Sequence, residues 1–261
     1  MGELDYETRH RLRPHDFAIL EDFDFKYAPV GFKFFNAEGE LGGLGLEPLG
    51  AKMSWCQMLR EAQGGRTFYA TVENHVCEPG VFLTGHGPLT PLAASGRIGP
   101  AFEIFADERA NRRIYNHISM LAEGSTFATG FAPVDKLVFD PDILIIGCDD
   151  MDQGERVLRA TQWDTGDMIT SHMTYVMGCN WLFTYPFVTG NINVVWTGVC
   201  HGMTGYELHP PGLPIVAIPW HHIDRVLRNM REMPRKLPAH TEEREEAHRR
   251  GLDRLGVEGI I

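Results

Sequence analysis

The chain has 261 residues, of which 43% are hydrophobic and 23% charged, a balance that is typical of a globular protein with a sizeable core. Its 24 basic and 35 acidic residues give a formal net charge of −11, which would repel a polyanion, so nucleic acid is not expected as a partner. No window approaches the roughly 18 apolar residues of a membrane span and no signal peptide is evident, so we expect a cytoplasmic protein, without a membrane partner, whose five cysteines stay reduced.

Helical and strand-like patterns alternate along the chain. Helical spacing, N-cap residues and closing glycines predict helices over 14–25, 54–62, 101–117, 153–162, 180–187, 221–233 and 241–255. Alternating or continuous apolar runs predict strands over 28–35, 66–77, 126–132, 142–148, 191–200 and 214–220. The interleaved order predicts an α/β fold in one globular domain over 1–261, an α+β arrangement with a mixed sheet flanked by helices.

Two segments of the chain resemble each other. In both, Cys-x-x-Leu opens a short helix, a glycine ends it, and a β-rich strand leads to a second cysteine. The first pair is Cys56 and Cys77, the second is Cys179 and Cys200, and each pair is separated by 21 positions. An internal repeat with a pseudo-two-fold axis would bring the four thiols together. Coincidence is the alternative, because five cysteines offer ten pairwise separations.

These four cysteines are the candidate ligands of a cofactor. Thiolates are soft ligands, so four that converge would suit an iron–sulfur cluster, or zinc as the alternative. No CxxC pair is present, and free cysteines are often simply buried, so packing is the competing interpretation. Cys148 ends an apolar run and is predicted to belong to the core.

Polar residues close to the cysteines are candidates for acid–base or orienting roles. They are Glu73 and Asn74, which precede Cys77, and His201, which follows Cys200. A cofactor-free enzyme with a cysteine nucleophile would instead need one thiolate and a general base such as His75 or His201.

Several motifs resemble the family known as domain of unknown function 169. They are PVGFKFF (29–35), CQMLREAQGG (56–65), ENHVCEPG (73–80), FDPDILII (139–146), GCNWLFTYP (178–186) and GNIN (190–193). The resemblance covers about 16–238 and leaves a charged helix at about 241–255 outside it. It implies recurrent cysteines at Cys56, Cys77 and Cys179, whereas the position of Cys200 is a cysteine in only some members, so three ligands and four ligands both stay open.

The resemblance implies no established activity, but members are common in anaerobes. We therefore expect a thiolate-bound metallocofactor, iron–sulfur rather than zinc, acting on a small molecule in anaerobic metabolism. Three ligands and an open iron would suit a lyase or hydratase, and four ligands an oxidoreductase. A non-catalytic carrier or redox sensor and a cofactor-free cysteine enzyme are the alternatives. A homo-oligomer is also open.

Overall fold

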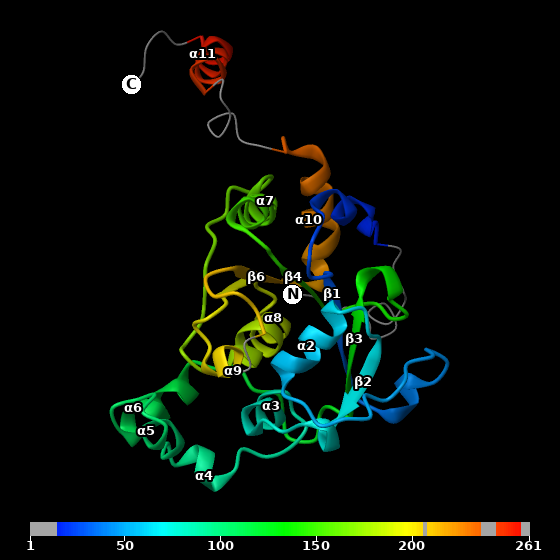
Figure 1. Cartoon of the computed structure of the whole chain (residues 1–261), viewed down its shortest axis with the longest axis vertical. Coiled ribbons are helices and arrows are strands. Elements are labelled where there is room, and N and C mark those ends of the chain that lie inside the picture. The colour runs from blue at the N-terminus through cyan, green and yellow to red at the C-terminus, as the bar shows by residue number, and fades with distance from the viewer. Residues whose placement is uncertain (1–14, 206–207, 236–243, 257–261) are drawn as a thin grey trace.

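A single six-stranded β-sheet forms the centre of the molecule, whose computed structural model describes residues 15–205, 208–235 and 244–256. The strands are β1 (Val30–Phe35), β2 (Phe68–Thr71), β3 (Ala128–Pro133), β4 (Ile143–Gly147), β5 (Asn193–Trp196) and β6 (Pro214–Pro219). Their order across the sheet is β2-β3-β1-β4-β6-β5, and every pairing between them is antiparallel (Figure 1). The α/β class and the single domain are confirmed. The prediction of a mixed sheet was wrong, because the interleaving of helices and strands in the sequence does not fix whether neighbouring strands run parallel or antiparallel.

Helical segments of very different lengths connect the strands. The α-helices are α2 (Trp55–Gln63), α3 (Glu78–Leu83), α4 (Pro91–Ala94), α5 (Ile98–Ala101), α6 (Glu108–Arg113), α7 (Met151–Gln162), α8 (Tyr185–Thr189), α9 (His201–Gly205), α10 (Trp220–Glu232) and α11 (Arg244–Leu255). The 3₁₀ turns are η1 (Phe17–Phe23), η2 (Glu38–Leu41), η3 (Val72–Asn74), η4 (Ile114–Asn116) and η5 (Val134–Lys136), and η6 (Asn180–Thr184) is a π-helical turn. Among the described residues, none of these helices is long and apolar enough to cross a membrane.

The prediction of one continuous helix over 101–117 was wrong. The chain instead forms α5, a turn, α6 and η4. The turn includes Glu103 in the left-handed region, with φ of 58°. The side chain of Asp107 then accepts a hydrogen bond from the amide of Ala110 and starts α6 as a new helix.

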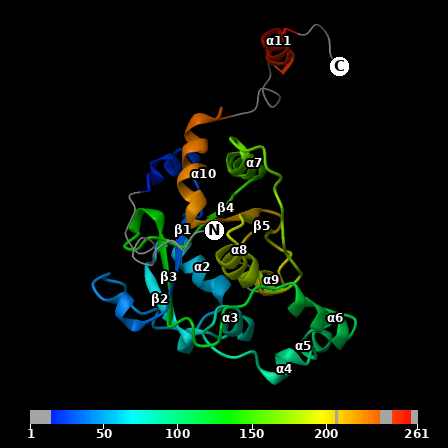
Figure 2. The ribbon, with the colours of Figure 1, turned by 180° about the vertical axis from the view of Figure 1, so that it is seen from behind.

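The two faces of the sheet pack against different helices. Along β4, Ile143 and Ile145 join the core beneath α2 and η6, whereas Leu144 and Ile146 join the core beneath α7 and α10. Figures 1 and 2 show the sheet between these two groups of helices. The alternation is the period of two that a strand buried on both faces imposes.

The strand order reads the same from either edge of the sheet. From the edge inward, the first half of the chain contributes β2, β3 and β1, and the second half contributes β5, β6 and β4. The central pair, β1 and β4, is antiparallel, as a two-fold axis between them requires. This order has the topology that the predicted repeat would produce, while the equivalence of the two halves in detail stays a prediction.

Asn229 provides a test of the packing between α7 and α10. Its buried side-chain amide donates to the carbonyl of Ala160 at 2.8 Å and to the carboxylate of Asp164 at 2.7 Å. We expect Asn229→Ala to lower the free energy of unfolding by about 1–3 kcal/mol, because both acceptors lose a donor. Urea denaturation would measure the change. Glu232→Ala, at an exposed position on the same helix, is the control, and equal effects of the two substitutions would contradict the assignment.

Candidate functional site

Four of the five cysteines line one pocket of about 240 Å³, although they are far apart in the sequence. They are Cys56, Cys77, Cys179 and Cys200. Each of the four thiols lies within electrostatic reach of the other three. The fifth, Cys148, is buried in the core on the other face of the sheet. The structure therefore brings together the four cysteines that the sequence singled out and leaves out the one predicted to be core.

Each of these cysteines lies where a helix begins. Cys56 is in the first turn of α2, Cys77 directly precedes α3, Cys179 precedes η6, and Cys200 precedes α9. The start of α2 is fixed by a capping box, in which the Ser54 hydroxyl and the Gln57 side chain each accept the other residue's amide. Amide groups that a helix leaves unpaired at its first turn are thus available near the sulfurs.

Backbone amides contact three of the sulfurs. The amide of Gly178 donates to Sγ of Cys200 at 3.2 Å. Amide contacts from Gly80 to Cys77 and from Asn180 to Cys179 act to lower the pKa of those two thiols. Such N–H···S contacts favour the thiolate form and are among the features that tune metal–sulfur centres.

Burial opposes ionisation of these thiols in the protein alone. It raises the pKa of Cys56 and of Cys179 well above the ordinary value, and the neighbouring sulfurs raise both further. The pKa of Cys77 is raised by the same two causes, more modestly. At neutral pH these three thiols are therefore protonated unless a bound cation compensates for their burial.

The remaining wall of the pocket carries no charged side chain among the described residues that form it. Besides the cysteines, those residues are Ser54, Trp55, Pro79, Ile98, Phe102, Ile104, Val176, Met177, Gly178 and Gly202. Three of them come from 98–104, in the lobe of short helices α4–α6 that projects from the body in Figure 1. Phe102 is 67% exposed and lies at the pocket with most of its ring in solvent. Sequence reasoning missed this segment because its apolar spacing was assigned to one regular helix.

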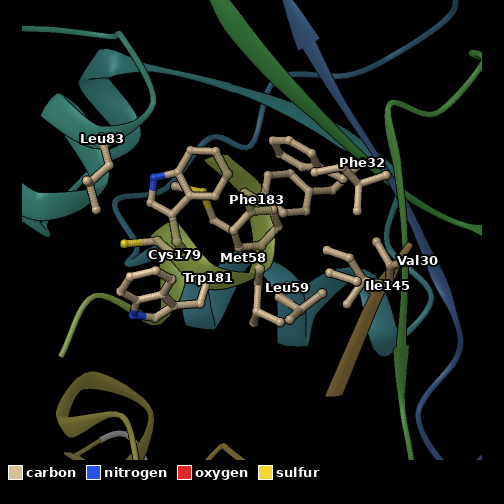
Figure 3. Close-up of a cluster of buried hydrophobic side chains, with 14 of the residues drawn as sticks. Val30, Phe32, Met58, Leu59, Leu83, Ile145, Cys179, Trp181 and Phe183 are labelled. Atoms are coloured by element: carbon tan, nitrogen blue, oxygen red, sulfur yellow. The ribbon is translucent and has the colours of Figure 1, made fainter. Parts of the chain in front are cut away.

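Trp55 connects the pocket to the aromatic core. Its ring packs against Phe32, Phe131 and Phe183 with centroid separations of 4.8 to 5.5 Å. Its indole Nε1 is buried and has no hydrogen-bond partner among the described residues. Gly80 lies so close that a Cβ there would be 2.3 Å from Cδ1 of the indole. Figure 3 shows Cys179 in this same cluster, beside Trp181 and away from Val30 and Phe32. The pocket therefore has a rigid aromatic floor.

Two of the predicted acid–base residues, Glu73 and Asn74, are not in the wall of the pocket. Glu73 is exposed. The side chain of Asn74 accepts from the amide of Thr71 and donates to the carbonyl of Ala51, both at 2.9 Å, so it shapes the turn before Cys77. The side chain of His201 lies outside the described residues. The roles proposed for these three residues stay predictions.

His75 is buried beside the pocket. Its ring stacks on Trp55 at 5.3 Å, and neither ring nitrogen has a hydrogen-bond partner among the described residues. Burial, with the neighbouring His86, lowers its pKa to about 3. The imidazole is thus neutral at neutral pH and too weakly basic to activate a nucleophile efficiently.

The four thiols do not have the arrangement typical of a single bound metal ion. Within the described residues, no group of three or more His, Cys, Asp or Glu side chains has the arrangement needed to hold one metal ion. The thiols instead surround a pocket. The pocket thus combines four thiols, a backbone amide directed at one sulfur and a buried indole N–H without a partner among the described residues.

Comparisons with known proteins provide a family but no activity. The uncharacterised protein MJ0308 of Methanocaldococcus jannaschii is 33% identical over 104 residues, which are 39% of this chain and 44% of that protein. The match thus spans less than half of that relative's length. No solved structure matches the chain. The model of domain of unknown function 169, described as an uncharacterised ArCR family, matches residues 18–229. The chain therefore belongs to the domain of unknown function 169 family.

Proposed function

We propose that this protein binds an iron–sulfur cluster through Cys56, Cys77, Cys179 and Cys200 and acts with it on a small molecule. The observation that carries the proposal is the convergence of these four thiols, from both halves of the chain, on one pocket. Buried polar groups are retained where something compensates for their burial. A cationic cluster would do so for four ionised sulfurs.

The form of the pocket favours a cluster of several iron atoms over a single zinc ion. A tetrahedral zinc site draws four sulfurs around one point, whereas a polynuclear cluster holds its cysteines further apart. The thiols here surround a space of about 240 Å³. That volume is below the roughly 300–1,000 Å³ of pockets that hold drug-sized organic ligands. It suits an inorganic cluster with at most a very small substrate beside it.

Iron–sulfur clusters supply electron transfer, or Lewis acidity where an iron lacks a protein ligand. The chain's own contribution is positioning and exclusion of water. The amides of Gly178 and Gly80 hold sulfurs in place, and Ile98, Phe102 and Ile104 cover the pocket with apolar surface. The presence of Cys200 in the pocket supports four protein ligands and an oxidoreductase. The alternative is a cluster with three protein ligands in a lyase or hydratase, and the next experiment distinguishes the two.

Metal and sulfide analysis tests the proposal. We expect protein purified without oxygen, or reconstituted with iron and sulfide, to be coloured and to contain iron and acid-labile sulfide in similar amounts. Cys56→Ser, Cys77→Ser and Cys179→Ser should each lose most of the iron, because each removes a ligand. Cys200→Ser should do the same if there are four ligands, and should retain iron with an altered spectrum if there are three.

Cys148→Ser is the matched control, because Cys148 is a buried cysteine on the opposite face of the sheet. It should retain the full iron content. Wild-type protein that binds neither iron nor sulfide after anaerobic reconstitution would refute the proposal, and so would equal losses from Cys148→Ser and Cys56→Ser.

Thiol reactivity separates this proposal from a cofactor-free cysteine enzyme. In metal-free protein, the raised pKa values of Cys56, Cys77 and Cys179 leave these thiols protonated at pH 7. We expect iodoacetamide to modify them more slowly than the same cysteines in urea, with rates that rise only above about pH 9. Mass spectrometry of the labelled peptides would measure this. One thiol that reacts faster in the folded protein at pH 7 would favour a nucleophile instead.

A further inference from the structure

A second cavity, of about 630 Å³, adjoins the cysteine pocket across the short helix α9. Gly202 of this helix lines the cysteine pocket, whereas Thr204 lines the second cavity. Likewise α2 contributes Cys56 to the first and Arg60 to the second. The described residues that line the second cavity are Tyr27, Arg60, Gly198, Thr204, Leu208, His209, Pro210 and Pro211. Its chemistry differs from that of the cysteine pocket, because it contains a cation together with the polar side chains of Tyr27, Thr204 and His209.

Arg60 is the charged group of this cavity. Its guanidinium lies 4.1 Å from the centroid of the Tyr27 ring, which holds the cation in place. Arg60 forms no ion pair with a described carboxylate, whereas the nearby Arg66 pairs with Glu61 at 2.7 Å. None of the described residues that line the cavity is acidic. Among the described residues, Arg60 is therefore a cation without a carboxylate partner, in a chain whose formal net charge is −11.

His209 is directed at the same aromatic ring. Its imidazole meets the ring of Tyr27 edge-on, with centroids 4.9 Å apart and planes at 78°. Its Nε2 is buried and has no hydrogen-bond partner among the described residues. Burial, and then the positive charge of Arg60, lower its pKa to about 4. The imidazole is thus neutral at neutral pH, and it lies close enough to the guanidinium of Arg60 for that charge to disfavour its protonation.

The wall between the two cavities is held in place by its own hydrogen bonds. The hydroxyl of Thr204 donates to the carbonyls of Gly198 at 3.2 Å and of Cys200 at 3.1 Å. Its proton is therefore already engaged, whereas the guanidinium of Arg60 and Nε2 of His209 can still bond to a ligand. Leu208, Pro210 and Pro211 add apolar surface beside them.

We propose that this cavity binds the oxyanion group, a carboxylate or a phosphate, of a small organic molecule, with Arg60 as its charge partner and His209 as a second hydrogen-bonding group. The planar guanidinium matches either group with two parallel hydrogen bonds. The volume exceeds that of a bare oxyanion and lies within the roughly 300–1,000 Å³ of small-molecule sites. Apolar side chains would contact the organic part. This site does not depend on the cluster proposed for the neighbouring pocket.

Calorimetric titration of the full chain tests the site with two probes, inorganic phosphate and succinate, at ionic strength held constant with sodium chloride. We expect saturable binding of at least one probe to the wild-type protein. Arg60→Gln should weaken that binding by about tenfold or more, because a charge-assisted bidentate contact is lost. His209→Leu should weaken it as well, to a smaller extent. Arg66→Gln, which changes an arginine already paired with a carboxylate, is the control and should bind as the wild type does.

The two probes distinguish the two forms of the ligand. Binding of phosphate alone assigns a phosphorylated molecule, binding of succinate alone assigns a carboxylate, and binding of both assigns a general oxyanion site. If neither probe binds the wild type, or if Arg60→Gln and Arg66→Gln bind equally well, the proposal is overturned. Should Arg60→Gln fail to fold, as judged by its thermal midpoint, His209→Leu carries the test. Iron content should be unchanged in all three variants, so failure of this site and failure of the cluster proposal give different results.

Discussion

Four cysteine thiols at one pocket, two of them buried and two partly buried, are the constraint on which the rest of this structure depends. Thiols are weakly polar and bury readily, but as thiolates they repel one another and are costly to take out of water. The fold accommodates them by placing each at the start of a helix and by contacting three of them with backbone amides. It also seats them next to a tryptophan that three phenylalanines hold rigidly. The sheet and its helices thus serve to deliver four distant residues to one place.

Cysteines more than a hundred positions apart meet because equivalent places in the strand order precede or follow them. The edge strands β2 and β5 each precede one cysteine of a pair, and the other cysteine lies in the first turn of α2 or directly before η6. Because α2 and η6 pack on the same face of the sheet, the cysteines at their starts lie on the same side of it. The second cavity follows from the same arrangement, because α2 and α9 each contribute residues to both cavities. Cys56 and Gly202 line the cysteine pocket, and Arg60 and Thr204 line the second cavity.

Local patterns were sufficient to predict the elements whose sequence and environment agree. The apolar run before Cys148 became the central strand β4, and Ser54 caps α2 as expected. The spacing of the cysteines pointed to the residues that converge. What could not be predicted depends on tertiary contacts. The break before α6 depends on one left-handed residue, Glu103, and no local pattern showed that 98–104 would reach over the sulfurs.

Proximity in sequence was the weakest guide to the site. Glu73 and Asn74 precede Cys77 closely, yet the chain turns at η3, so that one faces solvent and the other is engaged by the backbone. Arg60 and His209 carried no sequence signal, because they are about 150 positions apart and only Tyr27, from a third segment, brings them together. Side chains that meet only through tertiary packing are invisible to any local pattern.

The close approach of Gly80 to Trp55 constrains how this family can evolve. Any side chain at position 80 would occupy the space of the indole, which the surrounding phenylalanines prevent from moving aside. A relative can therefore place a larger residue at position 80 only if it has a smaller one at position 55. The two positions are 25 residues apart, and across many relatives their residue sizes should vary together in opposite directions. Packing in the wall of the cysteine pocket thus limits which pairs of residues these two positions can hold.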